Sequence, residues 1–293
     1  MRRSPSLGVA VASVAALLLG GRPAHAGNIW LTGHDADLHC TGGFQCNHFG
    51  TALDFARQGA PNPFKPLLFL DTSSNELTVA AGQAVAKAKN SIEGADNPFS
   101  FTVVDPTSVG FSTLSLDVSS FSAIVIASDT TCGGCDLNTT FGVTPHSDAI
   151  NLRSSDITSF FNSGGGLVYF AGAANRDVYY ASVPVPAGAV AVSPPFTLTA
   201  DGAALGLLDP ADTNCCPTHN SFNLPGAGSP LKVAELDSEG FAETLFAGNV
   251  KIGGGGFEGG GDGAGPVVPE PSSLILLGLG GLTFVGASKR RLI

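Results

Sequence analysis

Short hydrophobic runs that alternate with helix-like segments constrain the fold of this chain more than any other feature. The runs that read as strands are 28–32, 67–70, 101–104, 123–127 and 167–170. Segments with helical patterning lie between them, at 49–58, 79–92 and 155–162. Strands buried on both faces are continuously apolar, and parallel neighbours need a crossover connection. The pattern therefore predicts an α/β domain with a three-layer, doubly wound, mainly parallel sheet, of the flavodoxin-like kind.

The pattern weakens after Gly172, where several prolines interrupt regular structure. Two further strand-like runs follow, at 231–236 and 242–246. Their short separation favours a hairpin, so we expect them to extend one edge of the sheet in antiparallel fashion.

The N-terminus has the three parts of a secretory signal peptide. A basic start at Arg2 and Arg3 precedes a continuous apolar run over 7–21, and Ala24-His25-Ala26 supplies the small-x-small cleavage pattern. The alternative is a retained membrane anchor, but the run is shorter than the roughly 20 residues that a spanning helix needs. We expect signal peptidase to cut after Ala26, which makes 1–26 a signal peptide and exports the rest.

The C-terminus resembles the PEP-CTERM sorting domain that exosortases recognise. Pro269-Glu270-Pro271 is followed by an apolar stretch over 274–287 and then by basic residues at 289–291. The resemblance implies a sorting signal over 267–293 whose transmembrane helix anchors the protein in the inner membrane until the tail is processed near the triplet. The protein would then reach the surface or extracellular matrix of a Gram-negative, exopolysaccharide-producing bacterium. The alternative is an ordinary C-terminal anchor, which would also place the body outside the inner membrane.

The remaining boundaries follow from composition and charge. A glycine-rich segment at 253–266 reads as a flexible linker, which leaves 27–252 as the folded domain. Without both terminal signals, residues 27–268 contain 8 Lys or Arg and 23 Asp or Glu. Such an acidic body excludes nucleic acid as a partner and disfavours binding to anionic lipid, because both need a basic surface. Extracellular polysaccharide remains a candidate partner.

The segment 156–173 resembles the helix, triple-glycine turn and strand of the class I glutamine amidotransferase-like superfamily, particularly its ThuA-like branch. In the amidotransferases a nucleophilic cysteine follows this strand, where backbone amides stabilise an oxyanion. Here the turn reads Ala171-Gly172-Ala173-Ala174. Because neither Cys nor Ser stands there, we expect no glutaminase chemistry of that kind.

Polar residues follow several predicted strands at the edge where α/β sheets bind ligands. The candidates for ligand or metal binding are His34, Asp35, Asp37, Asp71, Asp129 and His219. They would share one cleft if the loop 218–221 folds over the same edge. Imidazoles and carboxylates suit a divalent metal ion or a general acid/base pair. The alternative is that these aspartates cap helices and that 33–35 is a tight turn.

The six cysteines fall in three close pairs, Cys40 with Cys46, Cys132 with Cys135, and Cys215 with Cys216. In an exported chain an even number favours disulfides, although spacing alone does not choose the pairing. Redox catalysis by the CxxC and a zinc site at Cys132 and Cys135 are the alternatives. The two glycines of the CxxC and nearby aspartates disfavour the reactive thiolate that redox catalysis needs.

Two classes of function stay open. The first is an exported, surface-associated protein, sorted by an exosortase, whose domain binds a ligand or partner without catalysis. The second is an extracytoplasmic hydrolase acting on a sugar or amide through a metal ion or a His/Asp pair, with His34, Asp35, Asp129 and His219 as its site. The missing nucleophile favours the first.

Overall fold

The computed structural model describes residues 27–39, 46–72, 100–131, 136–213, 217–253 and 256–258. The chain divides into two units, 1–259 and 260–293, and every described residue belongs to the first. The predicted signal peptide, the helix at 79–92, most of the linker and the sorting signal lie outside the described residues. The side chains of all six cysteines do so as well.

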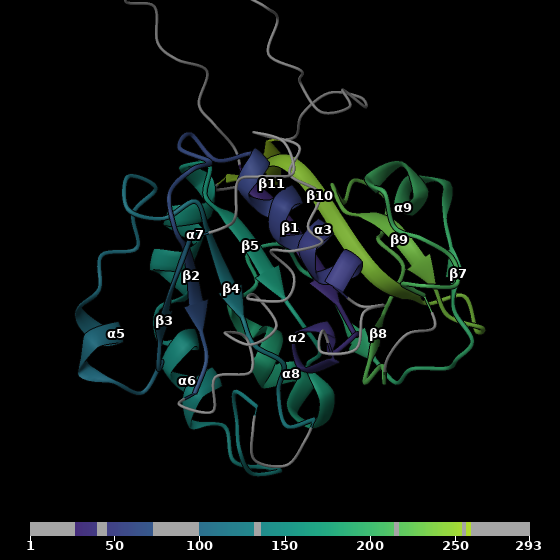
Figure 1. Ribbon diagram of the computed structural model, residues 1–293, viewed down its shortest axis with the longest axis horizontal. Coiled ribbons are helices and arrows are strands. Elements are labelled where there is room, and N and C mark those ends of the chain that lie inside the picture. Colours follow the sequence, from purple (N-terminus) through teal and green to yellow (C-terminus); the bar gives the residue numbers. More distant parts are fainter. Residues whose placement is uncertain are drawn as a thin grey trace, which may run out of the picture. The chain divides into compact units, whose positions relative to one another are not determined.

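A parallel sheet of five strands forms the centre of the domain (Figure 1). Its order is β3-β2-β4-β5-β1, and every neighbouring pair in it is parallel. The strands are β1 (Gly27–Thr32), β2 (Leu67–Leu70), β3 (Phe101–Val104), β4 (Ala123–Ile126) and β5 (Gly166–Tyr169). The predicted mixed α/β class with a mainly parallel sheet is therefore confirmed.

Antiparallel strands extend the sheet beyond β1, as the sequence predicts. The long strand β10 (Ala242–Gly253) runs antiparallel to β1, with Phe246 opposite Trp30, and β9 (Lys232–Leu236) pairs with β10. The shorter strands on this side are β6 (Ala189–Val190), β7 (Thr197–Leu198), β8 (Ser221–Phe222) and β11 (Gly256–Glu258). β10 thus joins the parallel part of the sheet to its antiparallel part.

Helices cover both faces of the parallel strands. The α3 helix (Cys46–Gln58) lies on the face of Trp30, whose ring is 5.9 Å from that of Phe55. The α7 helix (Ser154–Asn162) lies on the other face, where Phe161 packs against Gly27. Residues 27 and 30 point to opposite faces because side chains alternate along a strand. The sheet therefore lies between two helical layers here.

Close contact between α3 and β5 depends on a glycine. A Cβ atom built on Gly166 would lie 2.2 Å from the carbonyl oxygen of Ala56, far inside normal contact.

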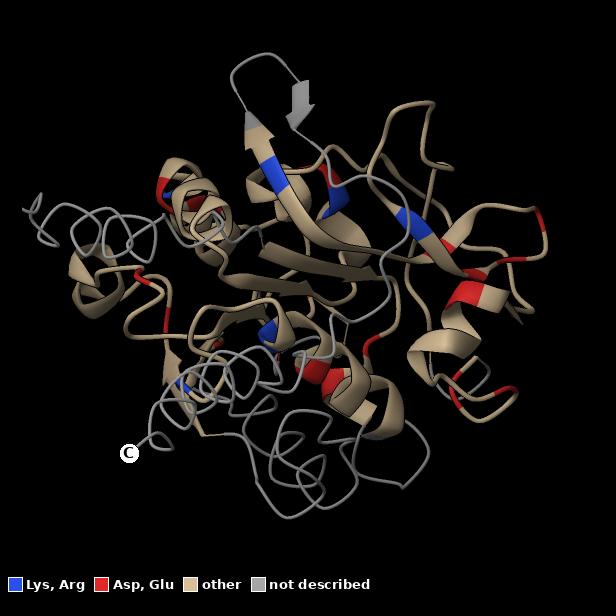
Figure 2. Ribbon diagram, turned by 90° about the horizontal axis from the view of Figure 1, so that it is seen from above, with Lys and Arg blue, Asp and Glu red and all other residues tan. Residues whose placement is uncertain are grey.

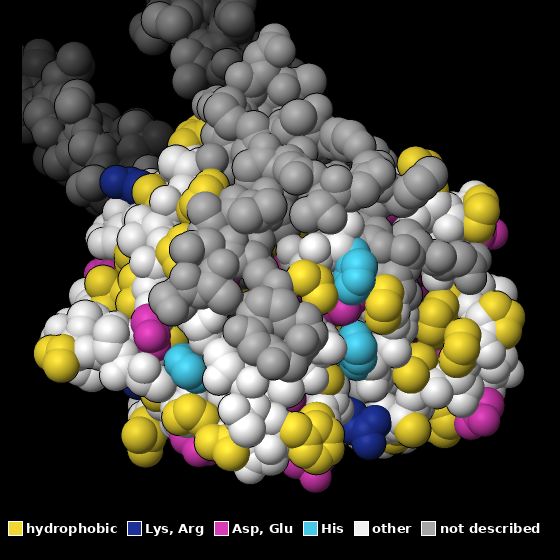
Figure 3. Space-filling model, turned by 60° about the horizontal axis from the view of Figure 1, so that its bottom comes forward, with side chains coloured by type: hydrophobic (Ala, Val, Ile, Leu, Met, Phe, Trp, Pro, Cys, Tyr) yellow, Lys and Arg dark blue, Asp and Glu magenta, His cyan; other side chains and the backbone are white. Residues whose placement is uncertain are grey.

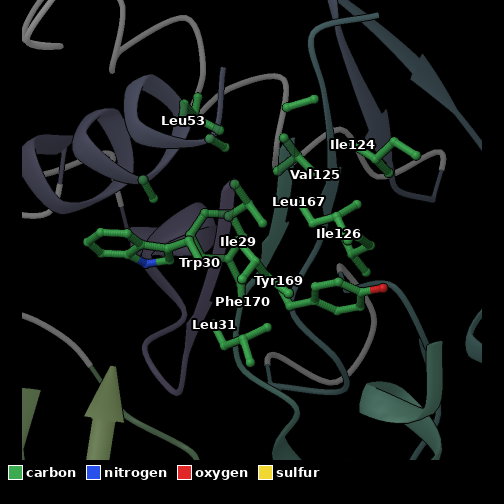
Figure 4. Packing of buried hydrophobic residues seen from close by; sticks show 14 of the residues in the cluster. Ile29, Trp30, Leu31, Leu53, Ile124, Val125, Ile126, Leu167, Tyr169 and Phe170 are labelled. Carbon is green, nitrogen blue, oxygen red and sulfur yellow. The ribbon is translucent and has the colours of Figure 1, made fainter. Parts of the chain in front are cut away.

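The buried strand residues fill the space between the layers, and Figure 4 shows Trp30 and Tyr169 directed away from each other. The continuous apolar runs of the sequence are thus explained by strands buried on both faces.

Five shorter α-helices and two 3₁₀ turns, at Ala173–Asn175 and Tyr180–Ser182, complete the described part of the domain. The α-helices are α2 (Ala36–His39), α5 (Val109–Thr113), α6 (Pro145–Asn151), α8 (Arg176–Tyr179) and α9 (Ala200–Leu205). Polar caps begin two of them, because Ser108 Oγ accepts from the Phe111 N–H and Thr199 Oγ1 accepts from the Gly202 N–H. No helix of the described residues is long and apolar enough to cross a membrane.

Several element ends differ from the prediction by a few residues. The α3 helix begins at Cys46 rather than at 49, and α7 begins at Ser154 rather than at 155. The fourth and fifth strands each end one residue earlier than expected, at Ile126 and Tyr169. Terminal hydrogen bonds set these ends, and hydrophobic periodicity does not report them.

Acidic and basic residues are dispersed over the described domain, as Figure 2 shows, without a large basic patch.

Candidate functional site

The segment after β7 and α9 crosses the carboxyl end of β1 and assembles the site. Gly33 accepts a hydrogen bond from the His219 N–H at 2.9 Å, and His34 forms an isolated β-bridge with Thr218. A Cβ on Gly33 would lie 1.7 Å from the Asn220 carbonyl oxygen, so only glycine permits this crossing. The loop 218–221 therefore does fold over the end of the first strand.

Four buried side chains meet beneath this crossing, and we call them the His–Glu cluster: His34, His48, Glu235 and Glu243. Each offers one nitrogen or oxygen atom, and these atoms all lie within 4.8 Å of one another. All four side chains are fully buried. They come from the second residue after β1, from α3, from β9 and from β10, so the cluster joins the parallel and antiparallel parts of the sheet.

The distances within the His–Glu cluster are short. His34 Nε2 lies 3.0 Å from Glu243 Oε2 and 3.4 Å from Glu235 Oε2. His48 Nε2 lies 3.4 Å from the same Glu235 oxygen. The two imidazole rings are edge to face, with centroids 5.0 Å apart. The cluster therefore gathers two imidazoles and two carboxylates around a common point.

Neighbouring polar groups fix the outer atoms of the cluster. Thr218 Oγ1 lies 2.8 Å from His34 Nδ1, on the far side of the ring from the glutamates. Glu243 Oε1 accepts hydrogen bonds from the Gly33 N–H at 2.9 Å and from the Thr32 hydroxyl at 3.1 Å. These bonds leave His34 Nε2 and Glu243 Oε2 directed at the centre of the cluster.

The hydroxyl of Thr244 lies between the two glutamates. Its oxygen is 2.6 Å from Glu235 Oε2 and 2.5 Å from Glu243 Oε2. A hydroxyl carries one proton, so it donates to one of these oxygens at a time. The hydroxyl can therefore satisfy only one of the two carboxylates at any moment.

Burial and charge act in opposite directions on the cluster. Burial alone lowers the pKa of His34, but attraction to Glu243 and Glu235 outweighs it, and the pKa rises well above the usual value. Burial likewise raises the pKa of Glu243. For Glu235, attraction to the His34 imidazole outweighs burial and lowers the pKa. The site thus favours positive charge beside its carboxylates.

A second group of polar residues lies at the surface beside the cluster. The buried Asp35 carboxylate is 3.0 Å from His39 Nδ1 through one oxygen and 3.0 Å from His219 Nε2 through the other. The His39 and His219 side chains are 36% and 25% exposed. Figure 3 shows histidine side chains reaching the surface of this face beside hydrophobic ones. A carboxylate that orients two accessible imidazoles can support proton transfer.

The other predicted site residues hold loops. Asp37 accepts from the Ser128 N–H at 2.8 Å and from the Ser128 hydroxyl at 2.5 Å. Asp71 accepts from the Thr72 N–H at 2.7 Å. Asp129 accepts from the Asn138 amide at 2.9 Å and from the Asn175 N–H at 3.0 Å. Asp37 and Asp129 thus hold together segments that are distant in the chain, and none of these contacts is the cap of a following helix.

Three members of the His–Glu cluster, namely His48, Glu235 and Glu243, were absent from the candidates that the sequence suggested. Glu235 and Glu243 lie about 200 positions after His34 in the chain, and His48 falls within a helix. The one signal that could have found the glutamates is a charged residue inside each apolar run, at 231–236 and 242–246. A charge at a buried strand position needs a partner, so such a residue marks a site.

The turn after β5 is occupied by backbone and tyrosine contacts. The Gly172 N–H donates to Tyr180 Oη at 3.0 Å and to Asn220 Oδ1 at 2.9 Å. Ala173 follows with a φ of 28°, in the left-handed region that side chains rarely adopt. The Gly172 amide is therefore already bonded within the protein.

Comparison with known proteins identifies one feature of the chain. Residues 267–291 match the family model of the PEP-CTERM protein-sorting motif. The chain matched no curated protein and no solved structure. The chain therefore carries a PEP-CTERM sorting motif, which supports an exported surface protein that an exosortase sorts.

Proposed function

We propose that this protein is exported, processed by an exosortase near Pro269–Pro271 and displayed at the cell surface or in the exopolysaccharide matrix, where its α/β domain binds a ligand or partner. The match of residues 267–291 to the PEP-CTERM motif carries this proposal. The signal-peptide pattern at 1–26 supports it, because such a peptide directs the chain to export and is then removed by signal peptidase. The acidic body suits a location outside the cell, because binding to nucleic acid would need a basic surface that this domain does not have in its composition.

A binding role without catalysis fits the turn after β5. The resemblance to the amidotransferase-like fold places a nucleophile at this turn, and the chain has Ala171-Gly172-Ala173 instead. The Gly172 amide donates to Tyr180 and Asn220, so it is not free to donate to an oxyanion. Ala173 has a strained φ, as residues at functional turns often do, but its side chain carries no reactive group.

Sorting is tested with the full chain in a host that has an exosortase. Changing Pro269, Glu270 and Pro271 to Ala is expected to keep the tail attached and the protein in the inner-membrane fraction. The control is Glu239→Ala on an exposed turn, which should reach the surface like the natural chain. Surface display of the triple variant at the natural level would overturn the sorting proposal.

A hydrolase is the second candidate, and the two contacts of Asp35 favour it. The carboxylate orients His39 and His219 at the surface, as a general base requires. Activity on sugar or amide substrates that falls at least about 100-fold in His219→Ala, but not in His146→Ala, would support it. Equal activity of both variants, or none in the natural chain, would leave the binding role.

A further inference from the structure

We propose that the His–Glu cluster is a binding site for one divalent transition-metal ion, zinc being the best match, with His34, His48, Glu235 and Glu243 as its ligands. This goes beyond the proposed function, because sorting and display need no metal. It also differs from the candidate set that the sequence suggested, which shares only His34 with the cluster.

The types of ligand select the class of ion. Two imidazole nitrogens and two carboxylate oxygens are a set that zinc and its first-row neighbours accept. Calcium and magnesium prefer oxygen ligands alone, and copper(I) prefers thiolate or thioether sulfur. Structural zinc is almost always held by four protein ligands, so a compact cluster of four side chains suits it.

The spacing of the atoms fits a tetrahedral site. Zinc lies roughly 2.0–2.2 Å from nitrogen and oxygen ligands, which makes the edge of the ligand tetrahedron about 3.3–3.6 Å. His34 Nε2 and His48 Nε2 each lie 3.4 Å from Glu235 Oε2. An N–H···O hydrogen bond is shorter, at about 2.7–3.2 Å. Both distances therefore suit two ligands of one ion better than two hydrogen-bonded partners. The third distance, 3.0 Å between His34 Nε2 and Glu243 Oε2, is in the hydrogen-bond range and would have to lengthen by a few tenths of an ångström around the ion.

The charge of the cluster calls for a cation. Two fully buried carboxylates carry two negative charges if both are ionised, and burying such charges without compensation is costly. Among the ion pairs of the described residues, Glu235 and Glu243 pair with histidines and with no Lys or Arg. One divalent ion and two neutral imidazoles would bring the cluster to zero charge.

An unpartnered oxygen is an independent sign of a ligand. Glu235 Oε1 is buried and has no hydrogen-bond partner among the described residues. A buried carboxylate oxygen normally finds a partner, because leaving it bare costs on the order of 1–3 kcal/mol or more. An ion held by Glu235 would compensate this oxygen directly or through its neighbour on the same carboxylate.

The surrounding hydrogen bonds resemble the outer support of metal sites. In such sites the second ring nitrogen of a ligating histidine bonds to a neighbouring polar group, which fixes the ring. Thr218 Oγ1 does this for His34 Nδ1 at 2.8 Å, and the Gly33 N–H holds Glu243 Oε1 at 2.9 Å. Both arrangements leave one atom of each side chain for the ion.

The site is closed, which points to a structural ion. All four side chains are fully buried, and four protein ligands leave no position for substrate in a tetrahedral site. The ligands come from both parts of the sheet, with His34 after β1 and Glu243 on β10. The ion would therefore tie the antiparallel extension to the parallel sheet.

The test measures zinc bound to the full chain, exported with its own signal peptide, purified, stripped with a chelator and titrated with zinc. After titration with zinc, native mass spectrometry should find one zinc ion per natural chain. After titration of the stripped chain with magnesium instead, it should find no bound magnesium. Glu235→Gln and Glu243→Gln should weaken zinc binding more than 100-fold. The matched controls Glu239→Gln and His146→Gln lie outside the cluster and should bind zinc like the natural chain.

Thr218→Val keeps the test informative if the glutamine variants do not fold. It leaves all four ligands in place and should weaken zinc binding about 10- to 100-fold, as expected for a group that orients a ligand. A natural chain that takes up no zinc would overturn the proposal and make the cluster a protonated histidine–glutamate network. Zinc retained by both glutamine variants would overturn it too, because the ion would then lie elsewhere, for example on cysteine thiolates.

Discussion

Asp37 makes the stability of the domain depend on pH in an unusual direction. Burial raises the pKa of this carboxyl group from 3.8 to about 8, despite two hydrogen bonds from Ser128. Asp37→Asn removes the titration but keeps a side chain of the same shape. Its amide can still accept from the Ser128 N–H, so the variant isolates the effect of the charge.

The size of the effect follows from the shift. Below about pH 3.8 the group is protonated in both the folded and unfolded chains, and its contribution is constant. As the pH rises towards 8, the unfolded chain releases the proton while the folded chain keeps it, so folding becomes less favourable. Each pH unit costs about 1.4 kcal/mol, and the whole window costs on the order of 5 kcal/mol.

Urea unfolding of the natural chain and of Asp37→Asn at pH 5.5 and 7.5 measures this cost. The free energy of unfolding of the natural chain, relative to the variant, should fall by about 3 kcal/mol between the two pH values. The comparison cancels the other titrating groups, because both chains share them. A difference between the chains that stays constant with pH would refute the assignment of a neutral, buried Asp37.

Three further predictions concern the metal site, the packing of α3 and the turn after β5. Zinc at 100 times its dissociation constant should raise the free energy of unfolding by about 2.7 kcal/mol, measured by urea titration with and without the ion. Gly166→Ala should destabilise the domain by about 1–3 kcal/mol, because its Cβ would meet the Ala56 carbonyl at 2.2 Å; unchanged thermal unfolding would show that α3 moves freely. Tyr180→Phe should cost about 1–3 kcal/mol, since Tyr180 Oη accepts from the Gly172 amide and donates to the Phe170 carbonyl; an unchanged free energy of unfolding by urea would contradict these contacts.

The central sheet could be read from the sequence because its signal is local. The run 67–70 coincides with β2, which is buried on both faces and apolar along its whole length. The run 101–104 coincides with β3, an edge strand that is only partly buried and was recognisable by its aromatic and β-branched residues. Short helices such as α5 and α9 were not predicted, because one or two turns give too little periodicity to detect. Their capping residues Ser108 and Thr199 were the available signals.

The site could be predicted only in part because it depends on pairing between distant strands. His34 and Asp35 follow a recognisable strand, so their place at the carboxyl edge was accessible from the sequence. The partners Glu235 and Glu243 reach His34 through the pairing of β10 with β1 and of β9 with β10. Neither strand order nor register is encoded in the local pattern, so the His–Glu cluster could not be assembled from it.

Export and sorting are tested together by the intact mass of the protein recovered from the surface of an exosortase-bearing bacterium. We expect a chain that lacks residues 1–26 and also the segment that follows the Pro269–Pro271 region, since export and sorting each remove one end. A surface-exposed chain that keeps 274–293, with its mass unchanged in a strain without the exosortase, would contradict this expectation.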